Sequence, residues 1–118
     1  MGKIRVETNE DSLFLEGEKI HAVTAGEEYI FDLEDVVKMV ILTTDMGPMY
    51  CDMGLAVDVG NGNVIFIMSD HRCYKSFLFD QIGKALPIDY QKVIEAASCI
   101  DNQVFLIYEK KNQEETAS

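Results

Sequence analysis

Alternation of apolar and polar residues is the most regular pattern in this chain. From Met49 to Val59 every odd-numbered position is apolar or cysteine, and the positions between are mostly polar or small. A period of two over this length predicts a strand that is buried on one face. The residues GNGN at 60–63 tolerate positive φ, so they predict a hairpin turn before a returning strand, VIFIMSD.

The first third of the chain predicts short strands joined by turns. Ile4 and Val6 alternate with charged neighbours, and polar segments separate the runs that follow. These runs lie at 13–15, 19–23 and 29–33. Such spacing is typical of an antiparallel meander. The segment 36–42 fits either a buried strand or a short helix, and its β-branched residues favour the strand.

After the hairpin the apolar spacing changes to three and four, which predicts an amphipathic helix. The residues that carry this spacing are Tyr74, Phe77, Leu78, Ile82, Ala85 and Leu86. Ser69 or Asp70 is predicted to cap the start of this helix, and Pro87 to end it. Asp89 is predicted to be the N-cap of a second helix that runs to about Ser98.

The order of these elements predicts an α+β fold. We expect a mostly antiparallel sheet of about six strands, packed by a two-helix hairpin that precedes a last strand at 104–109. The length of 118 residues suits one domain with its own core, so we predict a single globular domain over 1–109. The remaining residues, 110–118, are polar and are predicted to form a flexible tail.

Charge and cysteine usage restrict the possible partners and the compartment. The 21 acidic and 10 basic residues give a formal net charge of −11, which repels phosphates and anionic lipids. We therefore expect no nucleic-acid binding and no membrane binding. The three cysteines are odd in number and widely spaced, and the first ten residues lack the apolar core of a signal peptide. These features favour a cytoplasmic protein.

The sequence offers little support for catalysis or for a metal site. Among the cysteines and histidines, only His71 and Cys73 are close enough to hold a zinc ion together, and no second pair accompanies them. As a nucleophilic dyad they would diverge at a helix start, although nearby Arg72 and Lys75 keep the idea open. We predict no catalytic residue, no metal and no cofactor. Cys51 and Cys99 are interpreted as core residues.

Acidic residues concentrate in EEYIFDLED at 27–35, inside a stretch from Lys19 to Lys38 that has no other Lys or Arg. This segment could be a solvated face that keeps the protein soluble, or a docking surface for a basic partner. Asp45 and Asp52 flank the turn before the alternating strand. The carboxylates predicted to bind the partner are Glu27, Glu28, Asp32, Glu34, Asp35, Asp45 and Asp52.

Two short motifs carry a resemblance. TTDxGP at 43–48 and LPxDYxxVIEA at 86–96 resemble those of a family of small uncharacterised bacterial proteins. That family is similar in size, acidity and α+β layout to immunity proteins, which neutralise secreted bacterial toxins. The resemblance implies a basic toxin domain as the partner, and it implies no catalytic residue.

We therefore expect a non-enzymatic protein-binding module with an acidic docking surface. Complementary charge would steer a basic partner to this surface and enforce specificity. Two alternatives stay open. One is a small-ligand-binding or regulatory domain with a pocket under the 45–52 loop, and the other is a homodimer or larger homo-oligomer joined through a sheet edge.

Overall fold

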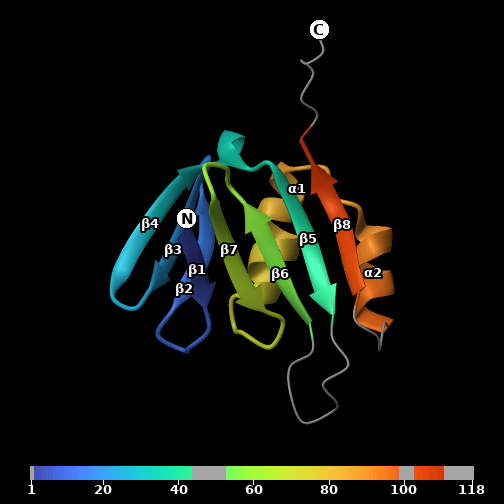
Figure 1. The fold of residues 1–118 in the computed structure, drawn as a ribbon, viewed down its shortest axis with the longest axis horizontal. Coiled ribbons are helices and arrows are strands. Elements are labelled where there is room, and N and C mark those ends of the chain that lie inside the picture. The colour runs from blue at the N-terminus through green and yellow to red at the C-terminus, as the bar shows by residue number, and fades with distance from the viewer. Residues whose placement is uncertain (1, 44–52, 99–102, 111–118) are drawn as a thin grey trace, which may run out of the picture.

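The strands form two sheets in the computed structural model, which describes residues 2–43, 53–98 and 103–110 (Figure 1). The five-stranded sheet has the order β1-β7-β6-β5-β8 and the three-stranded sheet the order β2-β3-β4. The first consists of β1 (Gly2–Val6), β5 (Lys38–Thr43), β6 (Met53–Asp58), β7 (Asn63–Met68) and β8 (Gln103–Glu109). The second consists of β2 (Ser12–Glu16), β3 (Lys19–Thr24) and β4 (Glu27–Asp32). The α+β class is confirmed, and the prediction of one sheet with about six strands was wrong.

The division into two sheets arises from the position of β1. This strand does not continue the meander but pairs in parallel with β7, with Ile4 opposite Ile65. The pairs β2–β3, β3–β4, β5–β6, β5–β8 and β6–β7 are antiparallel. At the other end of the small sheet, a short 3₁₀ helix, η1 (Leu33–Asp35), lies between β4 and β5. The apolar alternation predicted which faces are buried, but it carries no information about which strands pair.

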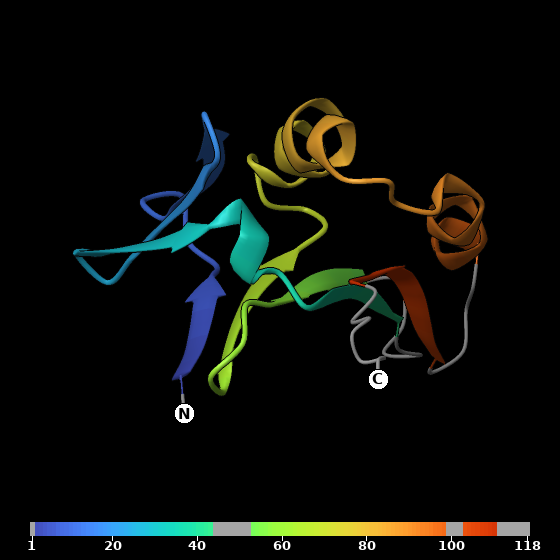
Figure 2. The same ribbon diagram turned by 90° about the horizontal axis from the view of Figure 1, so that it is seen from above.

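Two helical segments lie on the same face of the five-stranded sheet (Figure 2). The first comprises the π-helix η2 (Ser76–Ile82) followed by α1 (Gly83–Ala85), and the second is α2 (Tyr90–Ser98). The predicted pair of helices before a last strand is confirmed. The first begins later than its predicted caps at 69–70, since Tyr74 and Lys75, just before η2, are its first helical residues.

The boundary between the two helical segments matches the prediction. The helix α1 ends at Ala85, and Leu86 is extended before Pro87, as expected for the residue preceding a proline. Asp89 caps α2, because its Oδ1 accepts hydrogen bonds from the backbone amides of Gln91 at 3.1 Å and Lys92 at 3.3 Å.

The hydrophobic core lies between the five-stranded sheet, the helices and the inner side of the small sheet. Leu55, Val57 and Val59 of the alternating segment are buried, as predicted, whereas Met49 and Cys51 lie outside the described residues. Leu13 and Ile20 extend the core into the small sheet. The turn at 60–62 also follows the prediction, since all three of its residues have positive φ.

Within the described ranges, no helix is both long and apolar enough to cross a bilayer.

Candidate docking surface

Five of the seven predicted partner-binding carboxylates lie together on β4 and η1. We call them the acidic surface: Glu27, Glu28, Asp32, Glu34 and Asp35. All five residues are exposed. Asp45 and Asp52 lie outside the described residues. The strand β4 forms one edge of the small sheet, and β3 is its only strand partner in that sheet (Figure 1). The acidic surface therefore borders a sheet edge, where backbone groups are available to another chain.

Basic side chains from β3 partly neutralise the acidic surface. Asp32 is paired with Lys19 opposite it, and this hydrogen bond raises the pKa of Lys19. Glu28 Oε2 lies 2.8 Å from His21 Nδ1, and the His21 ring stacks on Phe14 with centroids 4.8 Å apart. These contacts hold two of the five carboxylates, and the Asp32–Lys19 pair is open enough to water for a partner to exchange it, since 53% and 57% of the two side chains are exposed.

Asp35 and Glu34 have different roles in η1. The Asp35 Oδ2 accepts a hydrogen bond from the Asp32 backbone amide at 3.1 Å, so this carboxylate also shapes the turn. The Glu34 carbonyl accepts from Lys110 Nζ at 2.7 Å, which ties η1 to the residue after β8. This contact uses the Glu34 backbone, so its carboxylate can be replaced without removing the tie.

Two apolar side chains lie among these carboxylates. Tyr29 is 36% exposed and Ile30 is 53% exposed, on opposite faces of β4. The Tyr29 hydroxyl donates to Glu27 Oε1 at 3.3 Å, and the Glu27 charge raises the pKa of Tyr29. Tyr29 therefore stays protonated at neutral pH. Large amphipathic side chains beside charges are typical of the residues that contribute most to protein interfaces.

His71 and Cys73 do not form a catalytic dyad in this structure. His71 is buried, and its Nδ1 accepts from the Cys73 backbone amide at 3.0 Å, so its Nε2 carries the proton. That Nε2 lies 2.8 Å from the Thr8 carbonyl and donates to it. Both ring nitrogens are thus hydrogen-bonded to backbone groups. Through these bonds His71 connects the loop before η2 to the turn after β1.

Arg72 also links the loop before η2 to the turn after β1, and the sequence did not reveal this role. Its guanidinium donates to the carbonyls of Asn9 at 3.2 Å and Asp11 at 3.0 Å, and to the Ser12 hydroxyl at 3.1 Å. A charged side chain with three acceptors from one turn is a structural clamp. Sequence reasoning missed this role because the partners lie about sixty residues away and two of them are backbone atoms.

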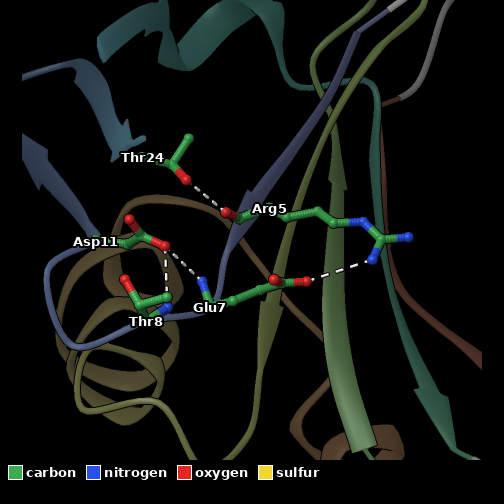
Figure 3. Close-up of polar contacts among 5 residues, drawn as sticks. All are labelled: Arg5, Glu7, Thr8, Asp11 and Thr24. Atoms are coloured by element: carbon green, nitrogen blue, oxygen red, sulfur yellow. Dashed lines mark hydrogen bonds and ion pairs between the residues drawn. The ribbon is translucent and has the colours of Figure 1, made fainter. Parts of the chain in front are cut away.

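Asp11 organises the same turn from inside (Figure 3). Its Oδ2 accepts hydrogen bonds from the amides of Glu7 and Thr8, both at 2.9 Å. These amides lower the pKa of Asp11, Thr8 contributing most, so the buried carboxylate stays charged. The Thr24 hydroxyl donates to the Arg5 carbonyl at 2.8 Å and joins β3 to β1.

A large groove beside this turn is the main candidate for a small ligand. It has a volume of about 700 Å³, and Arg5, Asp11, Thr24 and Tyr29 are among its lining residues. The Asp11 carboxylate and the hydroxyls of Thr24 and Tyr29 bond to other parts of the chain, as described above, so they do not converge on a ligand. The pocket predicted under the 45–52 loop lies outside the described residues. Within the described ranges, no group of three or more His, Cys, Asp or Glu side chains could hold a metal ion.

Comparison of the chain with protein-family models, curated proteins and solved structures finds no significant match.

Proposed function

We propose that this protein is a non-enzymatic binding module whose acidic surface docks a basic partner protein. The observation that carries the proposal is the edge strand β4. It combines Ile30 with the carboxylates of Glu28 and Asp32 on one face of the strand and Tyr29 with Glu27 on the other, and two further carboxylates follow in η1. Carboxylates beside apolar side chains supply both the charge that steers a basic partner and the contact area that holds it.

The mechanism is steric occlusion with electrostatic steering. A net charge of −11 attracts a basic protein over a long range, and the ion pair Asp32–Lys19 is replaced on contact by a pair with the partner. The immunity-protein role that the sequence resemblance implies is the narrower form of this proposal, in which the basic partner is a toxin domain. A cytoplasmic location is part of the same proposal.

Affinity capture from the cells in which the protein is made tests the proposal. The wild type should recover a basic protein, and the triple variant Glu27→Lys, Glu28→Lys, Glu34→Lys should lose it. These positions are chosen because Asp32 is paired with Lys19 and Asp35 accepts a hydrogen bond from the Asp32 backbone amide. A matched control reverses three exposed carboxylates elsewhere, at Asp70, Asp80 and Glu95. Capture should fall with added salt for the wild type and for the control alike.

Two outcomes contradict the proposal. One is that the wild type captures no basic protein. The other is that the control variant loses the captured protein as completely as the triple variant of Glu27, Glu28 and Glu34 does. Binding would then depend on the net charge of the protein and not on the acidic surface. A circular-dichroism spectrum of each variant establishes that the loss is not caused by unfolding.

A further inference from the structure

The front face of the five-stranded sheet is the face opposite the helices, turned toward the viewer in Figure 1. Side chains on the helix side of β5, β6 and β7 are fully buried, among them Ile41, Leu55 and Ile67. The alternate positions point forward and are also mostly apolar. The apolar front-face residues are Val40, Leu42, Ala56, Val64, Phe66, Met68, Val104 and Leu106. Val104 and Leu106 are 63% and 43% exposed, and the others are half-buried.

Strands that are apolar on both faces are typical of a sheet that is covered on both faces. A sheet with one wet face normally alternates apolar and polar residues. Here the strand registers align Arg5, Phe66, Ala56, Val40 and Leu106 in one row across all five strands, and four of the five are apolar. Within the described residues, helices cover only the other side. The front face therefore has the apolar composition that is usual for a sheet face packed against another layer.

The centre of the front face holds a shallow groove over Ala56 of β6. Gly54 and Ala56 are the small residues of this strand, and larger side chains flank them on β5 and β7. The Phe66 ring rests on Gly54, where a Cβ atom would lie 2.6 Å from Cζ. A cavity of about 280 Å³ opens over Ala56 between Leu42, Val64 and Phe66.

Two cations border this groove, although the chain as a whole is strongly acidic. Lys3 and Arg5 of β1 line the cavity beside Val64 and Phe66, and both are exposed. Arg5 Nη1 lies 3.3 Å from Glu7 Oε2, with 61% and 48% of the two side chains exposed, so this pair is weak and exchangeable. A ligand in this groove would therefore meet positive charge on the β1 side.

We infer that the front face binds an amphipathic helix of a partner protein, with its apolar stripe in the groove and its carboxylates against Lys3 and Arg5. A helix can present an apolar stripe and an acidic flank at once, and helices already cover the opposite face of this sheet. This surface is distinct from the acidic surface on β4 and η1, and its chemistry is opposite.

Two synthetic peptides of about five helical turns test the inference. Both carry the same leucine stripe, flanked by glutamate in one peptide and by lysine in the other. Nuclear magnetic resonance of the backbone amides locates where each one binds. The glutamate peptide should shift the amides of β6 and β7, although the net charge of the protein opposes it. The lysine peptide should shift β4 and η1, as the proposed function requires, so the two surfaces are tested separately.

Substitutions connect the binding to the named residues. Lys3→Glu with Arg5→Glu should weaken the glutamate peptide about tenfold, because two exposed ion pairs become repulsions. The control Lys84→Glu with Lys92→Glu, on the exposed side of the helices, makes the same change in net charge and should weaken it far less. Ala56→Glu should abolish binding by placing a carboxylate on the groove floor.

Three results would overturn the inference. The glutamate peptide could leave the amides of β6 and β7 unshifted. The two double variants could weaken it equally, which would mean that Lys3 and Arg5 have no special role. Finally, sedimentation could show that the free protein is a dimer and that Ala56→Glu makes it a monomer, in which case a second copy is the occupant. Thermal unfolding followed by circular dichroism verifies that each variant is folded.

Discussion

Asp11 controls the turn that joins the two sheets, and its replacement gives the sharpest test of how the fold is held. The side chain is 5% exposed, and one of its oxygens accepts from two backbone amides, those of Glu7 and Thr8. A hydrogen bond to a charged group contributes about 1.5–3 kcal/mol to stability. Glu7 and Thr8 are exposed, so in a variant without this carboxylate water can accept from their amides and replace part of the lost hydrogen-bond energy. Asp11→Ala should therefore lower the free energy of unfolding by about 2–3 kcal/mol.

Asp11→Asn separates the charge from the geometry. The amide oxygen can accept both hydrogen bonds, but it carries no charge, so we expect a loss of about 1 kcal/mol. The two amides hold the pKa of Asp11 below its ordinary value of 3.8. A carboxyl group with a lowered pKa stabilises the fold above its unfolded pKa, and the contribution disappears as the pH falls through its folded pKa. The difference between wild type and Asp11→Asn should thus be constant near neutral pH and shrink below pH 3.8.

Urea unfolding followed by circular dichroism measures these differences at pH 7 and near pH 3. A loss of less than about 0.5 kcal/mol for Asp11→Ala at pH 7 would refute the assigned role, since surface substitutions without structural roles have effects of that size. A difference between wild type and Asp11→Asn that stays constant down to pH 3 would refute the lowered pKa.

Further substitutions test the helical layer, each by urea unfolding at pH 7. Gly83→Ala should destabilise the protein by about 1–3 kcal/mol, because a Cβ atom there would lie 2.2 Å from the Leu78 carbonyl oxygen; a neutral effect would contradict the close approach. Phe77→Ala should cost about 3–5 kcal/mol, since this fully buried ring leaves a cavity, and a cost below 1 kcal/mol would contradict its burial. Asp89→Ala should cost about 1 kcal/mol through the lost cap, whereas Asp89→Asn should cost much less.

Local patterns predicted the elements well because they depend on neighbours in sequence. The alternation around Leu55 and Val57, the positive φ of the turn at 60–62 and the Asp89 cap all follow from a few adjacent residues. The dependence on local spacing also explains why η2 was predicted as a helix without its type. Its apolar residues recur at three and four, and that spacing does not distinguish a π-helix from an α-helix.

Long-range features were not predictable in this way. The parallel pairing of β1 with β7 joins residues about sixty positions apart, and the strand pattern of Ile4 and Val6 would suit a neighbouring strand equally well. The Arg72 clamp is similar, because its partners are mainly backbone carbonyls, which every residue possesses. The acidic surface could be located from sequence, since its carboxylates lie within nine consecutive residues, 27–35.

Hydrogen–deuterium exchange of the complex with the captured basic partner tests the central claim most directly. We expect β4 and η1 to gain protection on binding, with the peptide that contains Tyr29 and Ile30 changing most, because it forms the middle of the edge strand that the partner would contact. The triple variant Glu27→Lys, Glu28→Lys, Glu34→Lys should show no protection at the same partner concentration. Protection that leaves β4 and η1 unchanged and falls elsewhere on the molecule would contradict the account.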